Sequence, residues 1–267
     1  MIRATVGILA GVGGGFDSDY QAVLDYATTQ AYTLPSASQQ ALQNQLVVDL
    51  KTAGVWNKLD KLNIYYTDGD SDYACINWKN PGTFDSTKVN TPTFVVNKGF
   101  TSGVDGTFIR TNFTPSSDAV QMQDNNASFG GFFTENISSG NGLEIVSGTS
   151  ANNRNFIRVS NNGTAQGAIH ANNQTTTFSN PIASASGFMH IDKSSTTTAN
   201  YNKNGVSQVS FAPQSGIGLS SVEFTELALS TGGSSSDQFI AVSFYAASLQ
   251  SEVYDFYTAI NSYITSI

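Results

Sequence analysis

Cysteine and charge are scarce in this 267-residue chain, and each shortage excludes a class of protein. The single cysteine, Cys75, rules out an intramolecular disulfide and a zinc site built from cysteines, so a buried apolar position is expected for it. Charged residues make up 12% of the chain, against about a quarter in ordinary soluble domains. The surface must therefore be covered mainly by Ser, Thr, Asn, Gln and Gly.

Basic residues and long apolar runs are also scarce. The chain has 12 Lys and Arg against 20 Asp and Glu, a net charge of −8, whereas nucleic acid and anionic lipid attract clustered positive charge. We therefore exclude a nucleic-acid partner. No apolar stretch approaches the roughly 20 residues that span a membrane. The first 15 residues faintly resemble a signal peptide, but glycines break the apolar run and no cleavage site is clear, so a soluble chain is predicted.

Glycine is concentrated in one stretch near the start, GILAGVGGGF. A dinucleotide-binding loop needs glycine at the first, third and sixth places between a strand and a helix, but counting from Gly11 the sixth place is Phe16 and no Walker lysine follows. Alternating apolar residues from Ile2 to Ile8 indicate instead a short strand that needs a partner. Residues 1–16 are therefore interpreted as a glycine-rich attachment arm, with assembly residues Ile2, Val6, Ile8, Gly11, Gly13, Gly14 and Gly15.

A helical segment is predicted for residues 17–62, because apolar residues there recur every three or four positions. The first helix covers residues 17–31 and has acidic residues at its start, where the helix dipole favours them. The second covers residues 34–54, begins at a Pro-Ser pair and ends at Gly54. The stretch VWNKLDKL, residues 55–62, is predicted to add a short turn of helix.

From residue 63 onward the pattern is that of strands. Short runs such as TFVVN, LEIVS and FIAVSFYA are rich in Phe, Ile and Val, and Gly, Asn, Ser and Asp separate them. No helical segments lie between these runs to connect parallel strands. The sequence therefore predicts a mainly β protein. It has an N-terminal helical segment, a β-sandwich over residues 63–267, and a closing helix over residues 249–264 that Ser248 caps.

The sequence contains acids and histidines but no assembled catalytic motif. His190 and Asp192 alternate on one predicted strand, so a base and its orienting carboxylate can share a face, yet the G-x-S-x-G nucleophile motif is absent. Four acids lie on or beside predicted strands, and nothing in the sequence pairs them as a glycosidase requires: Glu135, Glu144, Glu223 and Glu226. We therefore predict no catalytic residues and no enzymatic activity, with cross-strand pairing of acids left open.

The stretch TDGDSDY is the best metal-binding candidate. Asp68, Asp70 and Asp72 occupy the first, third and fifth places of a calcium loop, but the sixth place is Tyr73 and the twelfth is Lys79, where Gly and Glu are required. A turn rich in Asp and Gly is the favoured interpretation. No cofactor is predicted, and calcium bound with ligands from elsewhere in the fold stays open.

Aromatic residues beside Asn and Asp are candidates for contact with sugars, although most aromatics in sandwiches are buried. Tyr73 follows the acidic turn, and Tyr201 lies in the turn sequence NYNKNG. We predict these two side chains as ligand-facing. Trp56 and Trp78 lie among Leu, Ile and Val and are expected in the core.

Several stretches resemble, in the same order and at similar separations, a family of bacteriophage structural proteins. They are LPSASQQALQNQLVVDLKTAGVWNKLDKLNIYY, ACINWKNP, NTPTFVVNKGFTSGVDGTFIRTNFTP and DNNASFGGFFTEN. In this family a small helical segment precedes a concanavalin A-like or laminin G-like jelly roll. ANYNKNG is similar to a strand and turn of laminin G-like domains, and FIAVSFYAASLQSEV to their final strand and closing helix. The resemblance covers about residues 34–267 and leaves the first sixteen residues unmatched.

This resemblance implies a non-enzymatic virion component of a tail, fibre, spike or capsid surface. The implied partners are other virion proteins and copies of the chain itself, and a host-surface glycan or receptor is the implied ligand. Fold alone does not fix a function. A stand-alone carbohydrate-binding lectin, or a glycan-active enzyme of the same fold, therefore remains the alternative.

Overall fold

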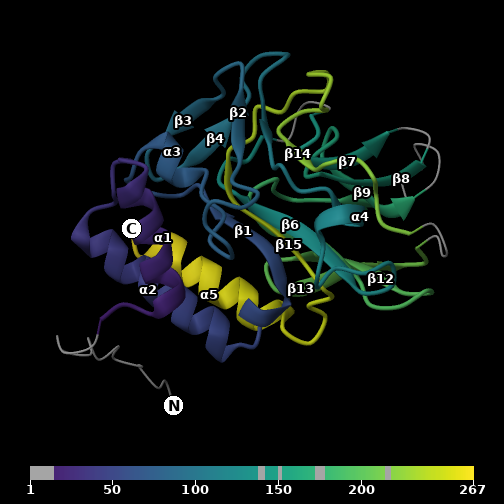
Figure 1. Ribbon diagram of the computed structural model, residues 1–267. Coiled ribbons are helices and arrows are strands. Elements are labelled where there is room, and N and C mark those ends of the chain that lie inside the picture. The colour runs from purple at the N-terminus through teal and green to yellow at the C-terminus, as the bar shows by residue number, and fades with distance from the viewer. Residues whose placement is uncertain (1–14, 138–141, 150–151, 172–177, 214–217) are drawn as a thin grey trace.

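Two antiparallel sheets face each other in the computed structural model, which describes residues 15–137, 142–149, 152–171, 178–213 and 218–267 (Figure 1). The first sheet has the order β13 (Val206–Phe211), β12 (Ala199–Lys203), β11 (Gly187–Lys193), β6 (Ala127–Phe133), β15 (Ile240–Ala246), β4 (Gly99–Thr101) and β3 (Thr93–Val95), and β1 (Leu59–Ile64) also pairs with β15. The second has the order β10 (Phe178–Pro181), β9 (Thr164–Ala171), β8 (Asn152–Arg158), β7 (Ile145–Thr149), β14 (Thr225–Glu226), β5 (Phe108–Arg110) and β2 (Thr87–Val89). The predicted mainly β sandwich is confirmed.

Three longer helices lie against the first sheet: α1 (Ser18–Thr29), α2 (Ala37–Thr52) and α5 (Val253–Thr265). The helices α1 and α2 begin where the sequence predicts, because the side chains of Asp17 and Ser36 accept hydrogen bonds from the first-turn amides of Asp19 and Gln39. Short helices occupy connections: η1 (Trp56–Lys58), α3 (Ser71–Ala74) and α4 (Pro115–Asp118). The N-terminal and C-terminal helices predicted from the sequence are thus both present.

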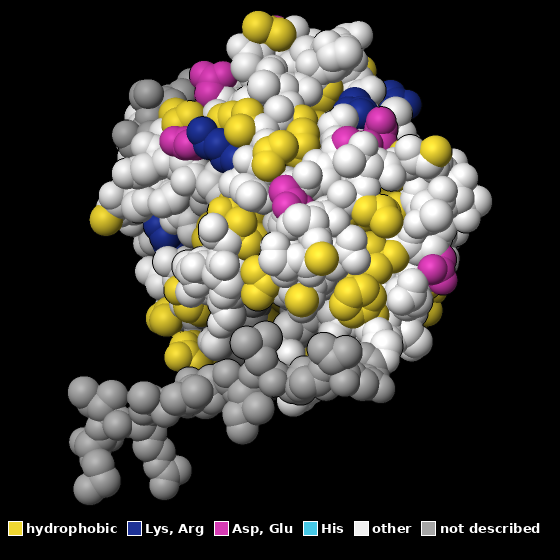
Figure 2. Space-filling view, turned by 90° about the vertical axis from the view of Figure 1, so that its left-hand side faces the viewer, with side chains coloured by type: hydrophobic (Ala, Val, Ile, Leu, Met, Phe, Trp, Pro, Cys, Tyr) yellow, Lys and Arg dark blue, Asp and Glu magenta, His cyan; other side chains and the backbone are white. Residues whose placement is uncertain are grey.

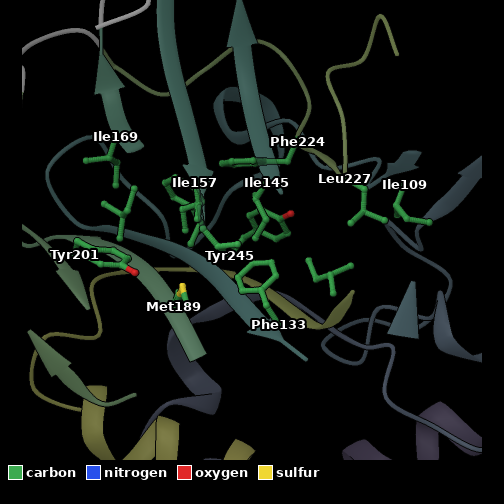
Figure 3. Packing of buried hydrophobic residues seen from close by; sticks show 14 of the residues in the cluster. Ile109, Phe133, Ile145, Ile157, Ile169, Met189, Tyr201, Phe224, Leu227 and Tyr245 are labelled. Carbon is green, nitrogen blue, oxygen red and sulfur yellow. The ribbon is translucent and has the colours of Figure 1, made fainter. Parts of the chain in front are cut away.

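The inner faces of the two sheets enclose one hydrophobic core (Figure 3). The first sheet contributes Phe133, Met189, Tyr201 and Tyr245, and the second contributes Ile145, Ile157 and Ile169. Phe224, just before β14, packs on Tyr245 with 4.5 Å between ring centroids. Aromatic pairs at such separations add to the stabilisation that comes from burying their area.

A second core lies between the outer face of the first sheet and the helices. Its centre is an aromatic group in which Phe256 of α5 contacts Phe188 of β11 and Phe244 of β15, with centroid separations of 5.0 and 4.7 Å. Trp78 is fully buried in this core, as predicted. The first sheet is therefore covered on both faces, which explains why every residue of β15 is buried.

A short helical turn is present within residues 55–62, but it covers only Trp56–Lys58, so the prediction of a helical segment reaching residue 62 is wrong. Helix η1 ends at Lys58, and β1 then pairs antiparallel with β15. The leucines at 59 and 62 have helical spacing, but Leu62 and Ile64 face the helices while Lys61 and Asn63 make buried polar contacts on the opposite face. Polar residues at these interior positions concealed the strand alternation.

The closing helix begins later than predicted, at Val253 rather than residue 249, and Ser248 does not cap it. The cause is Asp192 of β11. Its carboxylate accepts hydrogen bonds from Ser248 Oγ at 2.8 Å and from the Leu249 amide at 2.6 Å. These contacts fix residues 248 and 249 just before a turn at residues 250–252, and the helix starts only after that turn.

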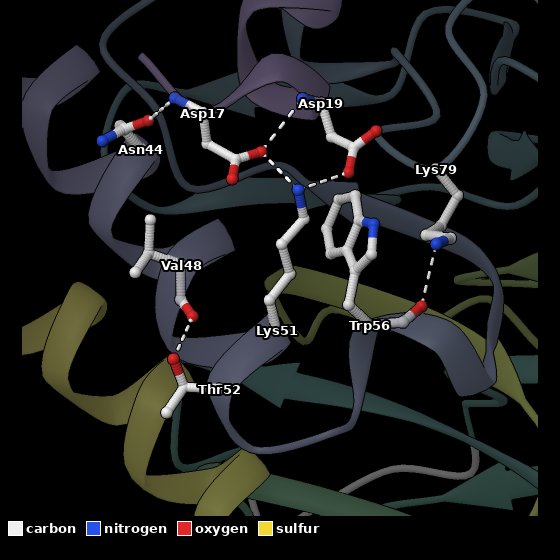
Figure 4. A network of polar contacts seen from close by, with 8 residues as sticks. All are labelled: Asp17, Asp19, Asn44, Val48, Lys51, Thr52, Trp56 and Lys79. Carbon is white, nitrogen blue, oxygen red and sulfur yellow. Dashed lines mark hydrogen bonds and ion pairs between the residues drawn. The ribbon is translucent and has the colours of Figure 1, made fainter. Parts of the chain in front are cut away.

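The predicted attachment arm lies almost wholly outside the described residues: Ile2, Val6, Ile8, Gly11, Gly13 and Gly14 are not described, and Gly15 is exposed. From Asp17 onward the chain is firmly held (Figure 4). Lys51 Nζ of α2 lies 2.5 Å from the Asp17 carboxylate and 2.6 Å from that of Asp19. The Asp17 amide also donates to Asn44 Oδ1 at 2.6 Å. The folded domain thus has a well-defined starting point at Asp17.

Charged side chains are few and scattered on the face that contains α1 and α2 (Figure 2). Uncharged polar groups and backbone cover most of it, as the composition predicts. Among the described residues, no helix has the length and apolar character needed to cross a membrane.

Candidate functional site

A pocket of about 440 Å³ lies between α5 and one end of the first sheet. Its lining comes from six separate stretches of the chain: Tyr66, Asn97, Phe132 to Thr134, Ser184 with Ser186 and Gly187, Lys203 with Asn204, and Tyr257, Asn261 and Ile264 of α5. Most of these side chains are hydroxyls, amides or aromatic rings. The pocket is therefore suited to an uncharged or weakly charged polar ligand that also has apolar faces.

The hairpin between β12 and β13 shapes one wall of the pocket. Asn204 and Gly205 form its two-residue turn with φ angles of 49° and 77°, the left-handed pair that an Asn-Gly turn provides. Asn204 Oδ1 accepts the Phe188 amide at 2.9 Å, and the Asn204 amide donates to the Phe188 carbonyl at 2.8 Å. A Cβ at Gly205 would lie 3.1 Å from the rings of Tyr254 and Tyr257 on α5. The turn therefore packs directly against the helix.

Several polar groups of the pocket are available to a ligand. Within the described part of the chain, the side-chain amide of Asn261 and the hydroxyls of Tyr66 and Tyr257 make no hydrogen bond. Ser184 and Ser186 bond to each other through Oγ atoms 2.9 Å apart. The Tyr66 ring packs edge-on against Tyr263 with 6.2 Å between centroids. The pocket thus combines fixed aromatic rings with free donors and acceptors.

One charged group, Lys203, lines this pocket. Its ammonium donates to the Ser184 carbonyl, and burial lowers its pKa. Lys98 and Glu135, the chain neighbours of lining residues Asn97 and Thr134, pair with each other at 2.5 Å and so offset each other's charge. Among the lining residues no carboxylate opposes the lysine.

The prediction that Tyr73 and Tyr201 face a ligand is wrong, because both are fully buried. Asp70 caps the short helix α3, which contains Tyr73. The Tyr73 side chain points inward, and its hydroxyl donates to Gln43 Oε1 at 2.8 Å. Tyr201 points to the inner face of β12 and stacks on Phe178 with centroids 4.7 Å apart. The tyrosines that line the pocket are Tyr66 and Tyr257, beside Phe132 and Phe133. Tyr257 recurs at helical spacing with the core residues of α5, so the sequence pattern does not distinguish this pocket residue from them.

The acidic turn uses its carboxylates within the protein. Asp70 accepts the amides of Thr33, Asp72 and Tyr73 at 2.7 to 3.1 Å; burial raises the Asp70 pKa, but these hydrogen bonds outweigh it and hold the pKa below its usual value. Asp68 accepts the Ser36 amide at 3.0 Å, and Asp72 pairs with Lys88 at 2.7 Å. In the ranges the structure describes, no group of three potential His, Cys, Asp or Glu ligands is suitably placed for a metal ion. The contacts favour the turn interpretation.

His190 and Asp192 share a face of β11, as the alternation predicts, but they bind different groups. Asp192 holds residues 248 and 249, whereas His190 Nε2 lies 3.1 Å from Asn202 Nδ2 and its ring packs between Phe188 and Phe244. Both residues are fully buried. Burial lowers the pKa of His190 to about 3 and raises that of Asp192 to about 6. Neither side chain can reach a substrate in this conformation.

The four acids considered for glycoside cleavage are held by contacts within the protein. Glu144 and Glu226 are buried: Glu144 accepts Ser236 Oγ and the Val159 amide at 2.7 Å, and burial raises its pKa to about 7. The other two acids pair with basic residues, Glu135 with Lys98 and Glu223 with Arg110 at 3.0 Å. None of the four lines the pocket.

Neither a family model nor a curated protein sequence matches the chain. Solved structures match it in shape. The fold is that of concanavalin A-like, lectin-type sandwiches. A tryptophan-to-alanine mutant of HCR/D has a TM-score of 0.55 at 10% identity over 77% of this chain and 53% of that one. The ligand-binding domain of botulinum neurotoxin serotype D, solved with N-acetylneuraminic acid, has a TM-score of 0.52 at 9% identity over 77% and 52%.

A sialidase of Trypanosoma rangeli, solved with sialic acid, has a TM-score of 0.50 at 10% identity over 84% of this chain and 39% of that one. The chain spans about half the length of the first two proteins and less of the sialidase. At such low identity these matches show the fold alone. The resemblance to phage structural proteins stays a prediction.

Proposed function

We propose that this chain is a non-enzymatic structural protein of a bacteriophage particle that displays a saccharide-binding sandwich. In this proposal it lies on the virion surface or on a tail appendage and assembles through its N-terminal region with other virion proteins and with copies of itself. A host-surface glycan binds in the pocket between α5 and the first sheet. The virion part rests on the resemblance of residues 34–267, and the binding part rests on that pocket.

The chemistry of the pocket supports a saccharide ligand. A pyranose has apolar C–H faces that pack on aromatic rings and hydroxyls that exchange hydrogen bonds with amides and other hydroxyls. Tyr66 and Tyr257 supply the rings, and Asn261 supplies an amide with no other hydrogen bond in the described structure. The volume of about 440 Å³ lies within the roughly 300–1,000 Å³ of small-ligand sites. Two proteins of this fold were solved with sialic acids, which is a further reason to test sugars.

The positions of the acids support a non-enzymatic role. Glycoside hydrolysis needs two carboxyl groups on either side of the scissile bond. Glu144 and Glu226 are enclosed in the sandwich, and the carboxylates of Glu135 and Glu223 are paired with basic side chains. None of these acids opens into the pocket, so a bound saccharide would meet hydroxyls and amides rather than an acid and a nucleophile.

Filling the pocket should abolish saccharide binding. Asn261→Trp places a large side chain from the exposed side of α5 into the pocket, and we expect at least a tenfold loss of affinity for any saccharide that the native chain binds on an oligosaccharide array. The matched control is Ser262→Trp, because residue 262 is the next position on the same helix, is exposed, and lies outside the pocket lining. Equal loss in both variants, or none in Asn261→Trp, would place the binding site elsewhere.

Removing the predicted arm should separate assembly from folding. Deletion of residues 1–14 should leave the thermal unfolding midpoint nearly unchanged, because the Asp17 cap and its contacts with Lys51 and Asn44 remain. The same deletion should abolish oligomer formation or incorporation into the particle, measured by light scattering and by electron microscopy. Normal assembly of the truncated chain, or collapse of its sandwich, would refute the role given to the arm.

A further inference from the structure

Lys203 differs from most lysines in the structure in having no acidic partner. Five others lie 3.3 Å or closer to a carboxylate: Lys51, Lys58, Lys88, Lys98 and Lys193. The Lys203 ammonium has one hydrogen bond, to the Ser184 carbonyl, although it carries three protons. In the described residues it has no ion pair, and it is half-buried at the edge of the pocket.

The location of this lysine is fixed by the sheet. Lys203 is the last residue of β12, pairs with Met189 of β11, and precedes the Asn204 turn that packs on α5. The hydrogen bond from Lys203 Nζ to the Ser184 carbonyl places the ammonium on the side of the pocket that Ser186 also lines. A ligand in the pocket therefore meets a positive charge in a constant position.

We propose that the pocket selects an acidic saccharide, whose anionic group pairs with Lys203. This inference rests on the proposed function, since it specifies the ligand of the same site. The pocket contains one cation and no acid, in a chain whose net charge is −8. A positive site on a protein of negative net charge attracts an anion, whereas the other charges of the protein repel it. Partial burial strengthens the pairing, because water screens it less. The same burial lowers the pKa of Lys203, and a bound anion would raise that pKa again because it favours the charged ammonium.

Carboxylated and sulfated sugars share the required charge, and paired ligands distinguish them. Isothermal titration should compare a hexuronic or nonulosonic acid glycoside with its carboxyl-reduced counterpart, and a sulfated glycoside with its unsulfated form. The native chain should bind at least one anionic form about tenfold more tightly than its neutral partner. The preference should weaken as salt is raised, because ions screen the pairing.

The variants assign that preference to one side chain. Lys203→Met should bind acidic and neutral forms equally while keeping its neutral-saccharide affinity, and Lys203→Arg should retain the preference. Lys79→Met is the matched control, because Lys79 is also half-buried, donates to a backbone carbonyl, forms no ion pair within the described residues and lies outside the lining. It should leave the preference unchanged.

Three results would overturn the inference in different ways. If the native chain binds neutral and acidic forms equally, the charge selection is wrong while the saccharide site stands. If it binds no saccharide of the panel, the proposed function falls and this inference with it. The native comparison needs no variant, so the test does not depend on whether Lys203→Met folds. A preference that persists in folded Lys203→Met would also contradict the role of Lys203.

Discussion

Replacing Glu226 by Ala is expected to destabilise the protein by about 3–5 kcal/mol, as removal of one member of a buried charged network does. The Glu226 carboxylate accepts the hydroxyls of Tyr65 at 2.8 Å and Tyr245 at 2.7 Å between the sheets. The ammonium of Lys61 is also fully buried, and among the described residues it donates to the Phe84 carbonyl and Ser86 Oγ. Burial raises the pKa of Glu226 and lowers that of Lys61 to about 8, while each charge partly offsets the other. Without the carboxylate, the hydroxyls of Tyr65 and Tyr245 lose this acceptor, and the Lys61 ammonium loses the negative charge that partly offsets its own.

Denaturant unfolding of matched variants tests this network. Glu226→Gln keeps the shape and one acceptor, so its loss should be smaller than that of Glu226→Ala. The double variant Glu226→Ala, Lys61→Met also removes the unpaired ammonium and should recover part of the lost stability. A loss below about 1 kcal/mol in Glu226→Ala, or no recovery in the double variant, would show that Glu226 does not stabilise the buried lysine.

Gly130→Val should cost about 3 kcal/mol or more, or prevent folding, because no side chain fits at this position. Gly130 lies in β6 opposite His190 of β11 and Phe244 of β15. The rings of these two neighbours approach to 5.8 Å between centroids. A Cβ on Gly130 would lie 2.3 Å from His190 Cβ and 2.4 Å from the Met189 carbonyl oxygen. The side chain would therefore force two central strands apart.

Soluble yield and thermal unfolding measure the effect. Gly233→Val is the matched control, because a Cβ there meets no atom within 4 Å and the residue does not have a positive φ. It should fold with nearly native stability. If Gly130→Val has the same thermal unfolding midpoint as the native chain, the close pairing of β6 with β11 is incorrect.

The sequence predicts most of the fold because its local signals agree with the global structure. The caps at Asp17 and Ser36 and the strand-rich pattern after residue 63 identify the helices and the sandwich correctly. Strand β1 is missed because Lys61 and Asn63 occupy positions between the sheets where apolar residues are expected. The polar network that satisfies them is made by residues far away in the chain.

The candidate site is harder to predict for two physical reasons. Its lining joins residues as distant as Tyr66 and Ile264, and none of the six stretches carries a motif of its own. The first sheet is also covered on both faces, so its strands lack the alternation that would show which side chains point outward. The prediction for Tyr201 is wrong because it places the residue in a turn, whereas Tyr201 lies in β12 with its ring in the core. The turn that follows β12 does border the pocket.

The most direct test of the central claim is a crystal structure of the chain with the tightest-binding acidic saccharide. We expect the sugar to lie between α5 and the end of the first sheet. One face of the sugar should pack on Tyr66 or Tyr257, and its anionic group should lie within about 3 Å of Lys203 Nζ, as charge-assisted hydrogen bonds require. A saccharide bound in another part of the sandwich, with this pocket holding only solvent, would contradict the account.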